Sequence, residues 1–481
     1  MATDIKEYIY YRSPIWLQNI IVSGQGLLFR YRRADERIMR EFYEFLIKSN
    51  RWTTEQYRSY QLIKLREILK IAFNNVPYYR DLQKELRCEP EDFKKPEDIS
   101  FLPILEKSQV RGQEHLFLNE TIDLKNCLAG GTGGTTGTPL KLYDIREGFS
   151  RRWAFVIRLR HWAGLKNPFY PRLAHFTGRK LLAPEQSLGK PIFWRWNFPG
   201  NALLFSSYHL TPQNVPYYVK ALNDYHPELI DGFPSALLAI VRVSRRLGLR
   251  LPSPQAIIVT SETIFPEHRA EIEEAFDCRL FDQYAASEPS CFWCDCEYGE
   301  MHENPEYGIS EIVNSVGEPA SPGEAGDILV TSFLNPVMLL IRYRLGDRAV
   351  RGSAARCLCG REMPRIEKIE GRFDDIFYIP ERGYVGRLDA PLKGLKNIIE
   401  SQVIQEDLEN IRVLIVPDLG YNPETGQQLI HALRYVVGDK INISIETVDN
   451  IPRLPNGKFI AQISKVKHLY PDEMDMYKHK A

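Results

Sequence analysis

A glycine- and threonine-rich run is the feature of this sequence with the clearest chemical potential. It reads GGTGGTTGTP over residues 130–139. Glycines let the backbone turn tightly and present successive amide N–H groups to an anion, and threonine hydroxyls add further donors. No Lys-Ser or Lys-Thr pair closes the run, so it is not a Walker loop. A flexible linker is the alternative, but linkers seldom alternate glycine with threonine and end in a stiffening proline. We therefore predict a phosphate-binding loop.

Five of the eight cysteines fall in two tight groups, at residues 291–296 and 357–359. Three of them, together with one histidine, supply the donor set of a tetrahedral Zn²⁺ site, and four protein ligands would make that site structural. The predicted ligands are Cys296, His302, Cys357 and Cys359. Cys291 or Cys294 could replace one of them, and a set of free buried cysteines is the alternative.

These groups need a scaffold, and the apolar pattern indicates a mixed α/β fold. Apolar residues recur at helical spacing within residues 35–75, and Pro77 ends the pattern because proline disfavours helix in the residue before it. Short apolar runs then suit buried strands; they lie at 203–205, 256–259 and 327–330. Two further strand patterns flank a helical stretch, as in a small α+β domain; these segments are 411–416, 425–437 and 441–445.

The length of 481 residues exceeds the size at which a single core usually stops growing. We expect a large N-terminal domain over residues 1–371, with a mainly helical lead-in over 1–120. A hinge at 372–375 and a small C-terminal domain over 376–481 should follow.

The overall composition excludes several classes of partner. Lys+Arg and Asp+Glu are equal at 62 each, which predicts no general attraction to nucleic acid or to acidic membranes and leaves local patches open. No run reaches the roughly 18 apolar residues of a membrane span, so we expect no transmembrane segment. Residues 15–22 are apolar but short, and a docked helix or loop is expected there in preference to a shallow membrane contact. The N-terminus lacks the features of a secretory signal, so a cytoplasmic location is expected. A homodimer is left open.

Residues 132–139, read as TGGTTGTP, resemble the TSGTTGKP signature of the adenylate-forming superfamily of acyl-CoA synthetases, adenylation domains and luciferases. Two positions depart from it, with Gly133 in place of Ser and Thr138 in place of Lys. Blocks similar to the family's other motifs follow in the family's order, namely SET at 261–263, FDQYAASE at 281–288, IRYRLGD at 341–347, GRFDD at 371–375 and LPNGK at 454–458.

The resemblance implies a catalytic set. Glu288 would hold Mg²⁺ beside the ATP phosphates, a role suited to a hard carboxylate oxygen. Arg372 would lie near the phosphates or the ribose, and Asp375 would act as the hinge. Lys458 would stabilise adenylate formation.

The same resemblance implies the nucleotide contacts. Tyr284 would stack on adenine, and Asp347 would accept hydrogen bonds from the ribose hydroxyls. The expected ATP- and AMP-binding residues are Thr132, Gly133, Gly134, Thr135, Thr136, Gly137, Ser261, Glu262, Thr263, Asp282, Gln283, Tyr284, Ser287 and Asp347.

Further segments resemble the phenylacetate–CoA ligase branch of this superfamily and its CapK-like members; they are VPYYR at 76–80, FSSYHL at 205–210, DGFPSAL at 231–237 and CLCGR at 357–361. Ligases of this branch carry a similar cysteine/histidine pattern. The resemblance covers essentially the whole chain and implies a large N-terminal domain of packed sheets and helices with a mobile C-terminal lid. The candidates for lining the acid pocket are Tyr208, His209, Gly232, Phe233 and Pro234. For His209, a packing or hydrogen-bonding role is the alternative.

The implied reaction is the ATP-dependent activation of a carboxylic acid as an acyl-adenylate, with release of pyrophosphate and transfer of the acyl group to an acceptor. Coenzyme A is the first expectation for the acceptor, followed by an amine or a carrier-protein thiol. ATP, Mg²⁺ and a structural Zn²⁺ are the expected cofactors. A degenerate member that binds nucleotide without turnover, and nucleotidyl transfer to a hydroxyl or phosphate, remain as alternatives.

Overall fold

A computed structural model describes residues 5–131, 140–177, 181–182, 192–210, 213–286, 288, 290–314, 316–372, 376–380, 383–386, 388, 397–453 and 459–466. The chain forms two compact units. Unit A comprises residues 24–171 and 281–370, and unit B comprises residues 1–23, 172–280 and 371–481. The predicted domain boundary at 371–376 stays a prediction, and the predicted hinge residue Asp375 lies outside the described residues.

Unit A contains the helices that the apolar spacing predicts over residues 35–75, with a break in the middle. Asp35 begins the first helix by accepting a hydrogen bond from the Arg37 amide at 3.0 Å, and Thr53 begins the second through a capping box with Gln56. The second helix ends at Asn75, directly before the sequence Val76-Pro77, as predicted. The helices of unit A are α3 (Glu36–Ser49), α4 (Thr54–Asn75), α5 (Pro77–Leu86), α6 (Lys107–Val110) and α7 (Arg146–Trp162).

The sheet of unit A is antiparallel at each pairing that the structure describes, with strands in the order β11-β12-β13-β14-β10-β9-β8. Their bounds are β8 (Leu280–Ala285), β9 (Phe292–Asp295), β10 (Met301–Glu303), β11 (Gly308–Val313), β12 (Ala325–Ser332), β13 (Tyr343–Arg351) and β14 (Arg365–Arg372). A separate hairpin joins β1 (Leu128–Gly131) to β2 (Lys141–Asp144). Buried side chains of α4, β12 and β13 share one hydrophobic core.

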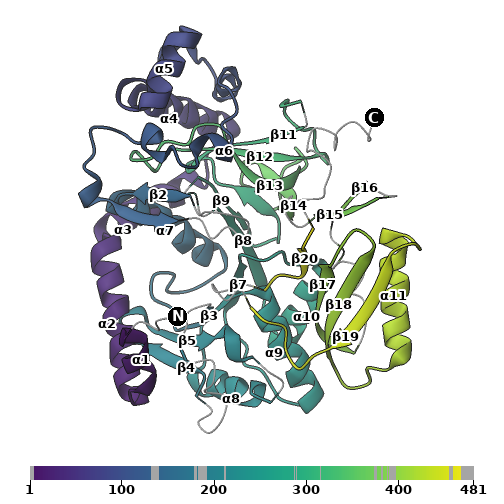
Figure 1. Ribbon diagram of the computed structural model, residues 1–481. Helices are drawn as coiled ribbons and strands as arrows, with labels where there is room; N and C mark the ends of the chain where they lie inside the picture. Colours follow the sequence, from purple (N-terminus) through teal and green to yellow (C-terminus); the bar gives the residue numbers. More distant parts are fainter. Residues whose placement is uncertain are drawn as a thin grey trace. The chain divides into compact units, whose positions relative to one another are not determined.

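Unit B is built on parallel strands with helices between them, visible in the lower part of Figure 1. The order is β7-β6-β3-β5-β4, and only β4 runs antiparallel to its neighbour. The elements are β3 (Leu173–Thr177), β4 (Trp194–Asn197), β5 (Ala202–Ser206), α8 (Val215–Tyr225), β6 (Leu229–Gly232), α9 (Pro234–Leu247), β7 (Ala256–Thr260) and α10 (Pro266–Phe276). The apolar runs at 203–205 and 256–259 are therefore buried strands, as predicted.

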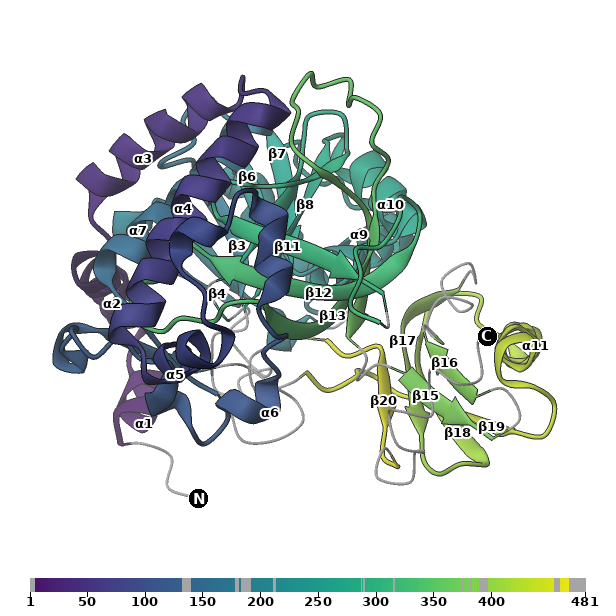
Figure 2. The same ribbon diagram turned by 90° about the horizontal axis from the view of Figure 1, so that it is seen from above.

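The end of the chain adds an α+β segment to unit B, shown in yellow-green in Figures 1 and 2. Its four-stranded sheet has the order β19-β18-β17-β20, and α11 contributes to the same hydrophobic core. The elements are β15 (Ile376–Ile379), β16 (Gly383–Gly386), β17 (Ile398–Gln405), β18 (Asn410–Pro417), α11 (Pro423–Val437), β19 (Asn442–Thr447) and β20 (Gln462–Ser464). The predicted strand–helix–strand pattern is confirmed, with boundaries shifted by a residue or two.

Two helices precede these elements, α1 (Ile5–Arg12) and α2 (Ile15–Arg33). Residues 15–22 begin α2, which buries Gln18 and Val22, so this segment is a docked helix. Among the helices that the structure describes, none is long and apolar enough to cross a membrane.

Candidate active site and metal centre

The predicted phosphate loop is flanked by the hairpin of β1 and β2. Gly131 pairs with Lys141 in that hairpin, so the described residues on either side of residues 132–139 lie next to each other. Residues 132–139, which carry the six predicted phosphate contacts from Thr132 to Gly137, lie outside the described residues, as do Ser287 and Lys458. Arg372 ends β14 and Tyr208 lies in a 3-10 turn; the described part of each is its backbone.

In unit A, two residues that the sequence predicts to bind the nucleotide, from separate motifs, contact each other. The Tyr284 hydroxyl on β8 donates a hydrogen bond of 2.6 Å to Oδ2 of Asp347 on β13, across 63 residues of sequence. The indole of Trp293 supports the Tyr284 ring, with centroids 5.1 Å apart. Beside Tyr284, the Gln283 Oε1 atom is buried and has no hydrogen-bond partner among the described residues. Such an orphaned acceptor suits a ligand that donates a hydrogen bond.

Glu288, the predicted Mg²⁺ ligand, is buried in the same unit. Its Oε1 atom lies 3.4 Å from the Lys107 ammonium and 3.4 Å from the Tyr343 hydroxyl. Tyr343 belongs to the same sequence block as Asp347, so the block carries two groups of this site. Lys107, on the short helix α6, was missed because an isolated lysine gives no sequence signal of its partner.

In unit B, Glu262 follows β7 after Ser261, which adopts a left-handed φ of 69°. Its carboxylate accepts hydrogen bonds from the Ser235 amide at 3.0 Å and from the Ser235 hydroxyl at 3.1 Å. It also accepts one from the Phe459 amide at 2.9 Å. Burial raises the pKa of Glu262, while Arg453 and these hydrogen bonds act in the opposite direction. Glu262 therefore contacts the residue that directly follows the predicted catalytic lysine.

The predicted acid-pocket residues Gly232, Phe233 and Pro234 lie where β6 ends and α9 begins. A Cβ atom at Gly232 would lie 2.6 Å from the Phe176 Cβ, so only glycine fits this close approach. His209 is buried, and its Nδ1 atom lies 2.8 Å from the Ser206 hydroxyl. This contact favours the packing and hydrogen-bonding role for His209.

A polar pair that the sequence did not indicate lies on neighbouring parallel strands of unit B. His175 on β3 is in register with Asp231 on β6, and their Nδ1 and Oδ2 atoms are 3.6 Å apart. The other Asp231 oxygen is buried without a hydrogen-bond partner among the described residues. Ligands of open α/β sheets bind outside the carboxyl ends of the strands, and Asp231 directly precedes Gly232. This pair is therefore a further candidate for substrate contact.

The four predicted metal ligands converge in unit A, with all donor atoms within 4.8 Å of one another. The Cys296 and Cys357 sulfurs are 3.8 Å apart, and the Cys359 sulfur lies 3.5 Å from the His302 Nε2 atom. Tetrahedral Zn²⁺ with ordinary bond lengths requires about 3.8 Å between two sulfurs and about 3.6 Å between sulfur and nitrogen. The donor set therefore fits zinc. Cys291 and Cys294 are not in this group among the described residues.

The surroundings of the cluster match those of a structural metal site. The His302 Nδ1 atom lies 3.2 Å from the Met363 carbonyl, which leaves Nε2 as the metal ligand. Backbone amides of Cys359 and Arg361 point at the sulfurs of Cys357 and Cys359, each at 3.5 Å. Burial lowers the pKa of His302 to about 4, so the imidazole is neutral, the form that binds a metal.

Comparison with known proteins agrees with the motifs. The CapK C-terminal domain family matches residues 377–465. Protein CapK of Staphylococcus aureus is 29% identical over 466 residues, which cover 96% of this chain and 99% of that protein. Phenylacetate-coenzyme A ligase of Thermus thermophilus is 23% identical, over 84% of this chain and 94% of the ligase.

Solved structures confirm the predicted fold class. The 2-hydroxyisobutyryl-CoA ligase in the postadenylation state, in complex with R3-HIB-AMP, has a TM-score of 0.67 and 18% identity. The match covers 88% of this chain and 92% of that one. The expected mixed α/β fold, with a large N-terminal and a small C-terminal part, is therefore present.

Proposed function

We propose that this chain is a member of the phenylacetate–CoA ligase and CapK-like branch of the adenylate-forming superfamily and that it activates a carboxylic acid with ATP. The product would be an acyl-adenylate and pyrophosphate, and the acyl group would pass to coenzyme A. The hydrogen bond between Tyr284 and Asp347 is the observation that best supports this proposal. It brings together the two residues proposed for the adenine and the ribose, from motifs 63 residues apart.

The proposed roles follow the chemistry of each side chain. Asp347 accepts hydrogen bonds from ribose hydroxyls, and Tyr284 offers its ring face to adenine. Glu288 provides carboxylate oxygens for Mg²⁺, and the nearby Lys107 ammonium adds positive charge beside the phosphates. Preorganised charges of this kind stabilise the negative charge that develops as pyrophosphate leaves.

Coenzyme A is the proposed acceptor because two kinds of similar protein, phenylacetate-coenzyme A ligase and 2-hydroxyisobutyryl-CoA ligase, carry it in their names. An amine or a carrier-protein thiol is a different outcome of the experiment below. We further propose that Cys296, His302, Cys357 and Cys359 hold a structural Zn²⁺. With four protein ligands, the ion would stabilise the fold and would leave no position for substrate.

The test is pyrophosphate release from MgATP in the presence of single acids from a panel of aryl, fatty, amino and sugar acids. Hydroxylamine traps an acyl-adenylate as a hydroxamate, which identifies the acid. Coenzyme A, amines and a carrier-protein thiol are then compared as acceptors with that acid. Binding of ATP without pyrophosphate release for every acid would contradict the proposal and favour a non-catalytic nucleotide-binding protein.

A matched pair of lysine variants tests the chemistry more sharply. Lys458→Ala should reduce pyrophosphate release by about 100-fold or more, in the range lost with other transition-state charge contacts, and should leave ATP affinity nearly unchanged. Lys465 lies seven positions along the same segment, and its ammonium pairs with Glu406 at 2.5 Å. Lys465→Ala should therefore keep the activity. Equal activity of both variants would refute the role assigned to Lys458.

A further inference from the structure

Arg342 has a backbone conformation that is uncommon for a residue with a side chain. It directly precedes β13, and its φ of 54° lies in the left-handed region. Its amide donates a hydrogen bond of 2.8 Å to the Thr331 hydroxyl, and its carbonyl accepts one of 3.0 Å from the Leu105 amide. Residues in strained conformations persist where surrounding contacts hold them, and they are concentrated at functional sites. The conformation of Arg342 therefore points to a role beyond packing.

The Arg342 guanidinium joins residues 100–102 to the sheet of unit A. Its Nε atom donates hydrogen bonds to both carboxylate oxygens of Glu311 on β11, at 3.0 and 3.2 Å. Its Nη1 atom donates to the carbonyls of Ser100 and Leu102, at 3.2 and 2.8 Å. A buried charge is costly unless it is paired and hydrogen-bonded, and the Arg342 side chain is exposed by only 7%. These contacts therefore hold residues 100–102 in a defined position.

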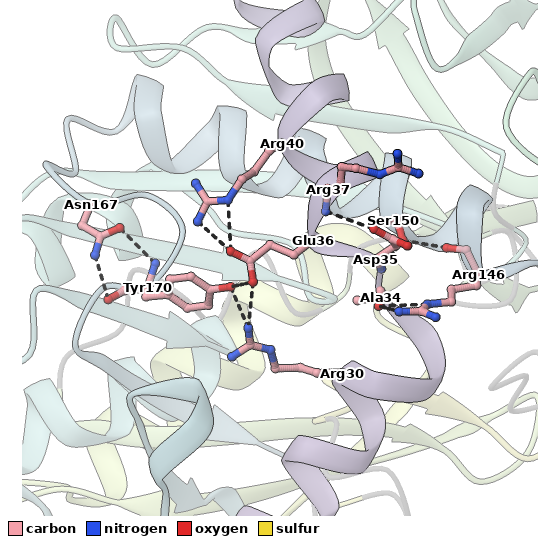
Figure 3. Close-up of polar contacts among 10 residues, drawn as sticks. All are labelled: Arg30, Ala34, Asp35, Glu36, Arg37, Arg40, Arg146, Ser150, Asn167 and Tyr170. Atoms are coloured by element: carbon pink, nitrogen blue, oxygen red, sulfur yellow. Dashed lines mark hydrogen bonds and ion pairs between the residues drawn. The ribbon is translucent and has the colours of Figure 1, made fainter.

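Other arginines of unit A form ion pairs at the surface. In Figure 3, Arg30 and Arg40 both contact the carboxylate of Glu36. Their side chains are exposed by 38% and 48%, and exposed ion pairs contribute little free energy. The burial of Arg342 distinguishes it from these surface arginines.

The segment that Arg342 holds leads directly to Lys107. The Leu105 amide donates a hydrogen bond of 3.0 Å to the Arg342 carbonyl. The Arg344 amide donates another of 3.0 Å to the Leu105 carbonyl. The chain is thus attached to β13 up to two residues before Lys107, which begins α6. The position of the Lys107 ammonium depends on this attachment.

Lys107 and Tyr343 are the described partners of the Glu288 carboxylate. The Lys107 ammonium and the Tyr343 hydroxyl each lie 3.4 Å from its Oε1 atom. The Oε2 atom has no hydrogen-bond partner among the described residues. Arg342 directly precedes Tyr343 and is connected to Lys107 through Leu105. One oxygen of the buried carboxylate is therefore held in place, and the other is available to a hard cation, which prefers oxygen ligands.

We propose that Arg342, held by Glu311, is a positioning residue for the metal ligand Glu288. It fixes Lys107 and Tyr343, and these two groups turn the free oxygen of Glu288 toward Mg²⁺. This inference rests on the metal-binding role proposed above for Glu288. Removal of a group that orients a metal ligand commonly changes metal affinity by about 10- to 100-fold. Arg342 acts through its neighbours and not by contact with the metal.

The test is the affinity for Mn²⁺, which takes the same oxygen ligands as Mg²⁺, in the presence of α,β-methylene-ATP. Electron paramagnetic resonance measures the free Mn²⁺, so this readout requires no turnover. Glu288→Gln identifies the part of the affinity that this carboxylate provides. Arg342→Met should weaken Mn²⁺ binding by at least about tenfold. Glu311→Gln should act in the same direction, and it keeps the inference testable should Arg342→Met misfold.

Arg158→Met is the matched control. Arg158 forms a buried ion pair with Glu306 in the same unit, and its contacts among the described residues do not include Glu288 or residues 100–107. This variant should be less stable and should bind Mn²⁺ normally. If Arg342→Met also loses only stability and keeps its Mn²⁺ affinity, Arg342 is a structural residue and the inference is overturned.

A double variant tests whether the effect passes through Tyr343. Tyr343→Phe removes the hydroxyl beside Glu288 and should itself weaken Mn²⁺ binding. Arg342→Met/Tyr343→Phe should lose less than the product of the two single losses, because the two residues act on the same ligand. A loss equal to the full product would argue against the proposed connection.

The same measurements separate this inference from the proposed function. A protein that binds Mn²⁺ with the analogue through Glu288, yet releases no pyrophosphate with any acid, would contradict the proposed function alone. A Mn²⁺ affinity that Glu288→Gln leaves unchanged would overturn the inference about Arg342, whatever the activity.

Discussion

The contact between Glu262 and the Phe459 amide gives a quantitative prediction about docking of the proposed C-terminal lid. Glu262→Gln keeps the size of the side chain but removes its charge, so the hydrogen bond from the Phe459 amide at 2.9 Å is no longer charge-assisted. Hydrogen bonds to charged groups contribute about 1.5–3 kcal/mol and neutral ones about 0.5–1.5 kcal/mol. The variant should therefore lose about 1–2 kcal/mol of docking free energy. Since Phe459 follows Lys458, pyrophosphate release at saturating ATP should fall about 5- to 30-fold.

Three measurements separate this effect from others. Hydrogen exchange of the described residues 459–466 should increase in Glu262→Gln, because the Phe459 amide loses its strongest acceptor. Ser235→Ala is the control, since it removes one hydroxyl contact to Glu262 and leaves the bond to Phe459 in place. ATP affinity, measured by calorimetry, distinguishes lid docking from a role of Glu262 at the adenine edge. Unchanged exchange together with unchanged pyrophosphate release would refute the reasoning.

Three further predictions concern stability. Arg158→Met would leave the Glu306 carboxylate buried without its cation, so it should lower the free energy of unfolding by about 3–5 kcal/mol. Arg40→Met is the control at an exposed position and should lower the free energy of unfolding by less than about 1 kcal/mol. Urea denaturation of both variants measures the difference. Burial raises the pKa of Glu303 to about 7, so the stability it supports is complete below about pH 4.5 and is lost as the pH rises through 7. The unfolding free energy should fall by about 1–3 kcal/mol over that range, and a Glu303→Gln variant that shows the same fall would contradict the assignment. Cys357→Ser should remove about one zinc ion per chain and lower the melting temperature. Elemental analysis measures the zinc content, and calorimetry measures the melting temperature. The prediction is refuted if the protein without the substitution contains no zinc.

The sequence alone indicated the similarity to adenylate-forming ligases, the fold class and the local structure. Adenylate-forming motifs are contiguous, so their residues can be identified without knowing what they contact. The capping residues Asp35 and Thr53 act on amides two or three positions away, and Pro77 acts on the residue before it. The strand–helix–strand pattern after residue 410 also depends on near neighbours only. Such short-range effects can be read from the order of residues.

The tertiary structure decided which groups meet. The Cys296 and Cys357 sulfurs approach across 61 residues, and the sequence left Cys291 and Cys294 as alternatives to the predicted ligands. The pair of His175 and Asp231 depends on the register of two parallel strands. Strand register and the direction of side chains follow from the packing of the whole core, because alternate residues of a strand point to opposite faces.

Helix α2 shows the same difference between what the sequence predicts and what tertiary contacts determine. The sequence of residues 15–22 predicts a docked helix, but a helix of apolar residues can turn any side toward the protein. Gln18 accepts a hydrogen bond from Arg195 and Asn19 accepts one from the Trp196 amide, and these contacts with residues far along the chain select the buried side. The side of α2 that is buried is therefore a consequence of tertiary contacts, since the energy that orients a helix comes from the partners it packs against.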